Sequence, residues 1–157
     1  MNIKNIRRKR GFTLIEMLIV IGLIAILSTI VLLAVNPGRQ FRIAHDTERK
    51  AHLIALLNAI GQNISEHSGK LMCDGRVFTL PETLTSIESD GAIAGLGPCL
   101  VPDYLPKLPF DSALPSAFFK SPSDFSTRYQ IKMDKDGYIT LSAESAASST
   151  QRIEVMR

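Results

Sequence analysis

The chain has 157 residues, of which 45% are hydrophobic, with 18 Lys and Arg against 15 Asp and Glu. This length allows one domain, or one small domain with an anchor, and excludes a multi-domain enzyme. The charged residues are too many for a polytopic membrane protein, and the hydrophobic fraction is too high for a disordered chain. Five basic side chains lie in the first ten residues, and the rest of the chain carries 13 basic and 15 acidic ones. The basic balance therefore belongs to the N-terminus and does not indicate a nucleic-acid-binding surface.

A long apolar tract follows the basic N-terminus. Residues 17–35 contain no charged side chain, and residues 12–35 contain only Glu16. As a helix, these 24 residues are about 36 Å long, enough to cross a hydrocarbon core of about 30 Å. The positive-inside rule places the basic end in the cytoplasm and the chain after residue 36 outside. Residues 33–37 lack the small-residue pattern of a secretory cleavage site, and an ordinary anchor leaves Glu16 unexplained.

The sequence from Arg8 to Glu16 reads RKRGFTLIE. It resembles the class III signal of type IV prepilins and type II secretion pseudopilins, in which a basic leader ends in Gly and Phe-Thr-Leu-Ile-Glu opens a long apolar helix. The resemblance is close over residues 7–35 and loose beyond. It implies that a prepilin peptidase cuts between Gly11 and Phe12 and that the new N-terminus of Phe12 is methylated.

The residue types at these positions suit that chemistry. Gly11 has no Cβ, so an active site can close tightly on the backbone there, and the basic leader holds the scissile bond at the anionic cytoplasmic face. Glu16 needs a partner, because a carboxylate buried among apolar groups is unfavourable alone. The resemblance implies that Glu16 of one subunit pairs with the Phe12 amine of its neighbour and fixes their register. A pair within one chain is the alternative, since the two residues lie one helical turn apart.

A second helical segment is expected from about residue 40 to residue 65. The sequence Asn36-Pro37-Gly38 interrupts the first helix, because proline removes a helical hydrogen bond and kinks or melts the turn. Apolar residues then recur at helical spacing, which predicts an amphipathic helix whose apolar stripe packs against a globular head. The predicted stripe comprises Ile43, Ala51, Ile54, Leu57, Ile60 and Ile64.

The C-terminal part predicts a small antiparallel sheet. Residues 129–133 alternate between apolar and polar, residues 138–141 favour a strand, and residues 134–137 form the hairpin turn between them. Residues 152–156 are expected to add a third strand. Six prolines lie between Pro98 and Pro122, which predicts a loop without regular elements.

Cys73 and Cys99 are the two cysteines of the chain. Outside the cytoplasm a disulfide between them is permitted, and closing a loop of about 26 residues adds about 3–4 kcal/mol in the chain-entropy model. Two free thiols in a reducing environment are the alternative. No C-x-x-C pair accompanies them, so the cysteines do not indicate a metal site.

Two weaker patterns concern metals. His45, Glu48 and His52 share one face of the second helix, but their spacing is not H-E-x-x-H, and solvated helix faces often carry such groups. Residues 134–137 resemble part of a calcium loop, but the third ligand position and the closing Glu are missing, and a hairpin turn accounts for Asp-Gly. We therefore expect no metal or cofactor. No nucleophile elbow or phosphate loop indicates an enzyme.

The sequence thus predicts an α+β, type IV pilin-like protein. Its long N-terminal helix is transmembrane in the first half and amphipathic in the second, and it packs against a small C-terminal antiparallel β-sheet. Residues 1–11 are the cleaved leader, residues 12–35 the transmembrane and assembly helix, and residues 36–157 the periplasmic or extracellular head.

The expected function is a structural subunit of a type IV pilus-like or type II secretion pseudopilus filament. The resemblance implies four kinds of partner: a prepilin peptidase and N-methyltransferase, other pilin-like subunits, an inner-membrane assembly platform and membrane lipid. We identify no nucleic-acid site. The expected location is the cytoplasmic (inner) membrane, then a cell-surface or periplasmic filament. The alternative is a membrane-anchored binding module that does not polymerise, and the motif does not separate pilus, secretion and DNA-uptake systems or major from minor subunits.

Overall fold

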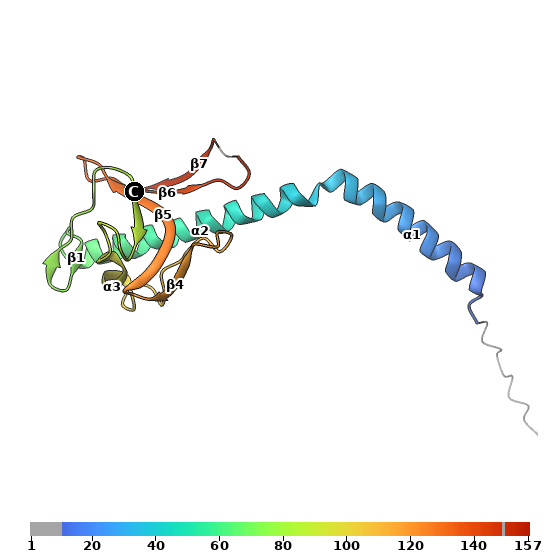
Figure 1. Ribbon diagram of the computed structural model, residues 1–157, viewed down its shortest axis with the longest axis horizontal. Coiled ribbons are helices and arrows are strands. Elements are labelled where there is room, and N and C mark those ends of the chain that lie inside the picture. Colours follow the sequence, from blue (N-terminus) through green and yellow to red (C-terminus); the bar gives the residue numbers. More distant parts are fainter. Residues whose placement is uncertain (1–10, 149) are drawn as a thin grey trace, which may run out of the picture. The chain divides into compact units, whose positions relative to one another are not determined.

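The computed structural model describes residues 11–148 and 150–157, so the predicted basic leader, apart from Gly11, lies outside the described residues. Figure 1 shows the helices and strands. The chain divides into two compact units between Gln40 and Phe41. The first unit contains helix α1, Leu14–Val35. Helix α2, Pro37–Glu66, begins in the first unit and continues into the second, which also holds the strands and is called the head below.

One residue separates α1 from α2. Asn36 has φ 45° and ψ 78°, a left-handed conformation that Asn tolerates better than most residues. Pro37 then takes the first position of α2, where its missing N–H leaves no helical bond unmade. Asn36 Oδ1 also accepts a hydrogen bond from the Arg39 N–H at 3.3 Å. The predicted interruption is confirmed, and α2 begins at Pro37, ahead of the expected start near residue 40.

The head is built around an antiparallel sheet. Its elements are β1 (Met72–Cys73), β2 (Arg76–Val77), β3 (Thr85–Glu88), α3 (Leu96–Leu100), β4 (Phe118–Ser121), β5 (Asp124–Met133), β6 (Ile139–Glu144) and β7 (Arg152–Met156). The larger sheet has the order β3-β5-β6-β7, with β4 also paired to β5, and β1 and β2 form a separate ladder. The three strands expected from the sequence are confirmed as β5, β6 and β7. The fold is α+β and pilin-like, as predicted.

The hairpin between β5 and β6 follows from its turn residues. Met133 is opposite Ile139 and Ile131 is opposite Leu141 in the ladder. Asp134 Oδ1 closes the turn by accepting from the backbone N–H groups of Asp136 at 3.0 Å and Tyr138 at 2.8 Å. Gly137 has φ 88°, a conformation that costs glycine little. The predicted Asp-Gly turn is therefore confirmed.

The hydrophobic core lies between α2 and the sheet. Its fully buried side chains include Leu53, Leu56 and Ile60 from α2 and Tyr129, Ile131 and Leu141 from β5 and β6. Burial of each aliphatic side chain contributes about 1.5–3 kcal/mol. This face of α2 therefore provides much of the stability of the head.

The predicted apolar stripe of α2 is partly wrong. Leu57 and Ile60 are buried, but Ile54 is 42% exposed and Ile43 is 40% exposed, and Ala51 is exposed as well. The run from residue 53 to residue 57 is apolar throughout, so its periodicity does not show which side faces the sheet. The actual buried face also includes two polar residues, Arg49 and Asn63, which a hydropathy pattern assigns to solvent.

The expectation of a loop from Pro98 to Pro122 is also partly wrong. Helix α3 extends to Leu100 within this stretch, and β4 occupies residues 118–121. No proline falls inside β4, so its backbone can pair with β5. Gly97 of α3 packs so closely that a Cβ there would overlap the Pro122 carbonyl oxygen and the Phe125 ring.

Candidate processing and assembly site

The predicted cleavage position lies in an exposed, non-helical segment before α1. Gly11, Phe12 and Thr13 are all exposed, and Phe12 is 71% exposed. A Cβ placed on Gly11 has no described atom within 4 Å, and Gly11 is not among the residues with positive φ. The described part of the chain thus gives no reason for glycine at this position.

Glu16 caps the N-terminus of α1 together with Thr13. Thr13 Oγ1 accepts a hydrogen bond from the Glu16 N–H at 3.2 Å. In return, Glu16 Oε2 accepts from the Thr13 N–H at 3.1 Å and from the Thr13 hydroxyl at 3.0 Å. This capping box satisfies two donors that a helix start otherwise leaves unpaired. This cap was not among the features expected from the sequence, although the Thr-x-x-Glu spacing is a readable signal.

Helix α1 exposes a continuous apolar surface. None of its 22 residues is buried, and in the described part of the chain it is the one helix long and apolar enough to cross a membrane. Its length is about 33 Å. The hydroxyl of Thr29 donates to the Ala25 carbonyl at 2.9 Å, so this polar group is satisfied within the helix. Such a surface is consistent with membrane anchoring.

The structure places the three residues of the candidate metal trio near one another. His45 Nδ1 lies 3.7 Å from Glu48 Oε2, and His52 Nε2 lies 4.0 Å from Glu48 Oε1. The other nitrogen of His52 is used elsewhere, at 2.8 Å from Tyr129 Oη. Over residues 11–148 and 150–157, no group of three or more His, Cys, Asp or Glu side chains is arranged to hold a metal ion. In residues 134–137, which resemble part of a calcium loop, the Asp134 carboxylate accepts the backbone hydrogen bonds that close the β5–β6 turn.

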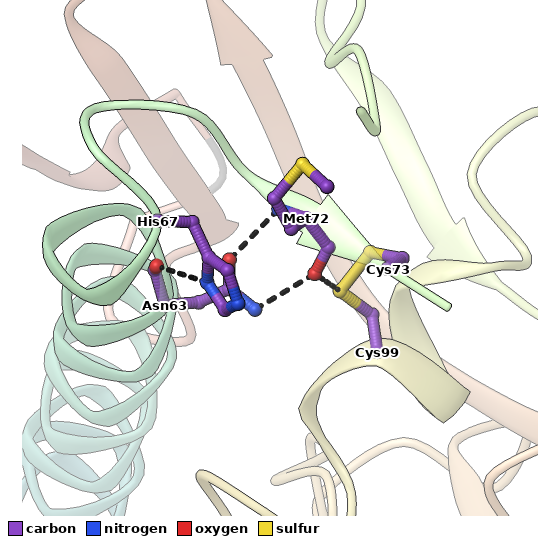
Figure 2. Close-up of a disulfide and its surroundings, with 5 residues drawn as sticks. All are labelled: Asn63, His67, Met72, Cys73 and Cys99. Atoms are coloured by element: carbon purple, nitrogen blue, oxygen red, sulfur yellow. Dashed lines mark hydrogen bonds between the residues drawn. A yellow bond between two sulfur atoms is a disulfide. The ribbon is translucent and has the colours of Figure 1, made fainter. Parts of the chain in front are cut away.

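Cys73 and Cys99 connect β1 to α3. The structure contains a disulfide between them, with the Cα atoms 4.8 Å apart. Figure 2 shows how Asn63 of α2 holds the neighbouring residue: its Nδ2 donates to the Met72 carbonyl at 2.9 Å and its Oδ1 accepts from the Met72 N–H at 2.8 Å. Asn63 is 1% exposed, and this pairing satisfies its buried amide. The β1 segment is therefore attached both to α3 and to α2.

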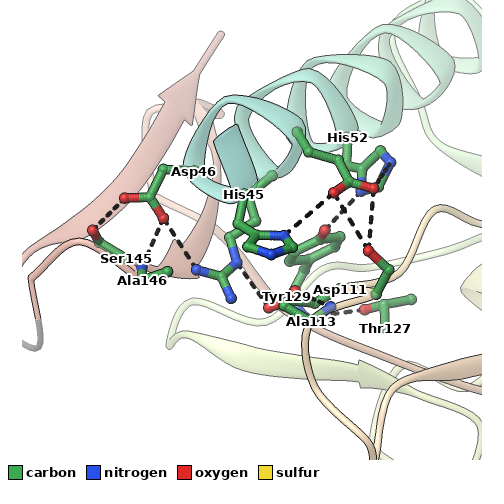
Figure 3. A network of polar contacts seen from close by, with 12 residues as sticks. His45, Asp46, His52, Asp111, Ala113, Thr127, Tyr129, Ser145 and Ala146 are labelled. Atoms are coloured by element: carbon green, nitrogen blue, oxygen red, sulfur yellow. Dashed lines mark hydrogen bonds and ion pairs between the residues drawn. The ribbon is translucent and has the colours of Figure 1, made fainter. Parts of the chain in front are cut away.

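A buried ion-pair network, which the sequence analysis did not identify, joins α2 to two loops of the head (Figure 3). Arg49 Nε donates to Asp111 Oδ2 at 2.8 Å, and Arg49 Nη1 donates to Asp46 Oδ1 at 3.1 Å. Asp46 also accepts from the Ser145 hydroxyl at 2.6 Å and from the Ala146 N–H at 2.7 Å. Arg49 and Asp111 are each 5% exposed. Such a network is costly to break, because one buried charge is then left unpaired.

Hydrogen bonds and charge pairing shift the pKa values of Asp46 and Arg49. Burial alone raises the pKa of Asp46, but hydrogen bonds from the Ser145 hydroxyl, two backbone N–H groups and Arg49 outweigh it, so the pKa lies below the ordinary value of 3.8. Burial alone lowers the pKa of Arg49, and pairing with Asp111 and Asp46 reverses that effect, so the pKa is raised. Asp46 and Arg49 are therefore both ionised at neutral pH.

A comparison with protein-family models identifies the prokaryotic N-terminal methylation motif at residues 6–32. The match includes the predicted cleavage position, both residues of the capping box and most of α1. No curated protein and no solved structure matches the chain. The chain therefore carries the N-terminal signal of type IV pilins and pseudopilins on an α+β, pilin-like fold.

Proposed function

We propose that the chain is a structural subunit, and not an enzyme, in a helical filament of the type IV pilus or type II secretion pseudopilus kind. The observation that carries this proposal is that the methylation motif runs into a helix with no buried residue. An apolar surface of this size needs apolar surroundings. Lipid provides them before assembly, and the α1 helices of other copies provide them afterwards.

Processing precedes assembly in this proposal. A prepilin peptidase binds the exposed segment around Gly11 and cuts before Phe12, and an N-methyltransferase activity then modifies the Phe12 amine. No residue of the described ranges comes within 4 Å of a Cβ placed on Gly11. This supports the step, because a peptidase active site that closes on the backbone would give a reason for glycine there. The leader stays at the cytoplasmic face of the inner membrane, and the head lies outside. An assembly platform in that membrane then moves the subunit into a periplasmic or cell-surface filament.

Glu16 is proposed to set the register between subunits. Among the described contacts, the capping box uses only its Oε2 atom, so Oε1 is available to a second donor. In a bundle of α1 helices, a carboxylate without a cationic partner is strongly unfavourable. The amine of Phe12 on a neighbouring copy supplies such a partner, and the cap keeps the carboxylate oriented before assembly.

The experiment compares two variants of the full-length protein in its host. Glu16→Ala removes the carboxylate, and we expect normal cleavage and membrane anchoring but a loss of sheared filaments of at least about tenfold. Thr13→Ala is the matched control, because it removes the hydroxyl that caps the helix, worth about 1 kcal/mol, and keeps the carboxylate. It is expected to assemble. If Glu16→Ala assembles as well as the wild type, Glu16 does not set the register. If the wild-type protein itself forms no filaments, a non-polymerising anchored module is the better description.

A further inference from the structure

A groove on the head combines apolar walls with one acidic and one basic side chain. It has a volume of about 340 Å³ and is lined by Glu48, His52 and Ala55 of α2 and by residues of the proline-rich segment 105–112, including Phe110. Small clefts with apolar walls and a few fixed polar groups are typical binding sites. Nothing in the motif or the proposed α1 bundle uses this groove.

The polar groups at the rim of the groove are held in place. Glu48 accepts a hydrogen bond from the Ser112 hydroxyl at 3.2 Å. His52 lies beside it, and the contact of His52 Nδ1 with Tyr129 Oη at 2.8 Å orients the ring (Figure 3). The Glu48 side chain is 45% exposed. Within the described residues, neither Glu48 nor Lys107 has an ion pair with an oppositely charged Lys, Arg, Asp or Glu. The rim therefore presents one negative and one positive group to a partner.

The turn between β5 and β6 carries complementary groups. Tyr138 is 52% exposed, and Lys135 and Asp136 beside it are exposed. Tyr138 directly precedes β6, whose first residue Ile139 is buried in the core, so the exposed tyrosine stands at the edge of the head. An exposed tyrosine close to charged residues is typical of an interface anchor.

The groove and the turn lie on opposite flanks of α2. The groove is lined by residues 48, 52 and 55, whereas residues 57, 61 and 64 adjoin Gly137 and Ile139 next to the turn. At about 100° per residue, these two sets are about half a turn apart around α2, and their centres are about 14 Å apart along it. Two different patches on opposite sides join copies head to tail, and repetition of such a contact gives an open helical assembly when the rotation does not close a ring.

We propose that the β5–β6 turn of one copy docks in this groove of the next copy. Tyr138 packs against Phe110 and its neighbouring prolines, Lys135 lies beside Glu48, and Asp136 lies beside Lys107. The partner is a second copy of this chain, because its turn supplies an aromatic anchor, a basic group for Glu48 and an acidic group for Lys107. This inference rests on the proposed filament function and adds a contact between heads to the packing of α1.

Photo-crosslinking of the full-length chain in its host tests the contact. Tyr138 is replaced by p-benzoylphenylalanine, and two differently tagged copies are expressed together so that links between copies are recognised. In sheared filaments, we expect crosslinked dimers. In these dimers the photo-reactive residue at position 138 of one copy is linked to a peptide that contains residues 105–112 of the other copy. The matched control has the same photo-reactive residue at Val77, which is 58% exposed on β2, and is expected not to label that peptide.

Charge reversal tests the same contact without a probe. Lys135→Glu and Glu48→Lys each place like charges together, and each is expected to lower the recovery of sheared filaments about tenfold. The double variant restores the pair and is expected to regain most of the loss. Lys70→Glu is the control, because Lys70 is exposed and takes part in none of the described ion pairs. Non-reducing electrophoresis checks in every variant that the Cys73–Cys99 bridge, and so the folded head, is retained.

The outcomes separate this inference from the proposed function. If wild-type filaments form but the photo-reactive residue at position 138 crosslinks to another region or to a different protein, the docking inference is overturned and the filament function stands. The same holds if the double charge reversal fails to restore assembly. If the wild-type chain is never found in filaments, the proposed function fails, and this contact fails with it.

Discussion

Replacement of Arg49 by Met isolates the contribution of the buried ion-pair network. The side chains of Arg49 and Asp111 are each 6% exposed, with Nε and Oδ2 at 2.8 Å. Methionine retains an apolar stem but removes the charge. Among the described contacts, the Asp111 carboxylate then keeps only the hydrogen bond from the Ala113 N–H at 3.2 Å. A buried charge stranded in this way typically costs about 3–5 kcal/mol, and we expect Arg49→Met to lower the free energy of unfolding by that amount.

Urea unfolding of the full-length protein in detergent micelles measures this loss. Tyrosine fluorescence is a suitable signal, because Tyr129 is 0% exposed and reports on the core beside the network. Lys50→Met is the matched control on the adjacent, exposed position, and its effect should stay within about 0.5 kcal/mol. Adding Asp111→Leu to Arg49→Met removes the stranded charge and should recover most of the loss. The reasoning is refuted if Arg49→Met alone stays within about 1 kcal/mol of the wild type.

Two further predictions concern the stability of the head. Reduction of the Cys73–Cys99 bridge, which has a sequence separation of 26, is expected to lower the free energy of unfolding by about 3.5 kcal/mol in the chain-entropy model. An unchanged urea midpoint under reductant would contradict a closed bridge. The pKa of Asp46 is lower in the folded state than its ordinary value of 3.8, so its stabilising effect is present above about pH 4 and is lost as the pH falls through the folded value. Asp46→Asn should therefore flatten the acid side of the stability curve, and a curve that keeps the wild-type slope there would count against this assignment.

The features that were predictable from the sequence are encoded locally. The order Gly11-Phe12-Thr13 with Glu16 and the apolar run after it identified the processing signal and α1. The Asp-Gly turn and the alternating residues 129–133 identified the β5–β6 hairpin, because strand periodicity and turn chemistry depend on near neighbours. The capping box is equally local, since the Thr-x-x-Glu spacing of Thr13 and Glu16 encodes it.

The features that were missed depend on partners far away in the sequence. Arg49 and Asp111 are 62 positions apart, and each looks like a solvated surface residue until the fold brings them together. The buried amide of Asn63 is satisfied by two hydrogen bonds with the Met72 backbone. No rule of residue spacing predicts this pairing. The buried face of α2 is chosen by the sheet that packs on it, since hydropathy alone gives two overlapping stripes around Leu57.

We propose that the mature chain begins at Phe12 and is built into a filament. Intact-mass measurement of the protein from host membranes and from sheared filaments tests it most directly. We predict a chain without residues 1–11 that carries one methyl group on the Phe12 amine in both fractions. A chain that retains residues 1–11 in a host with a competent prepilin peptidase would contradict the account.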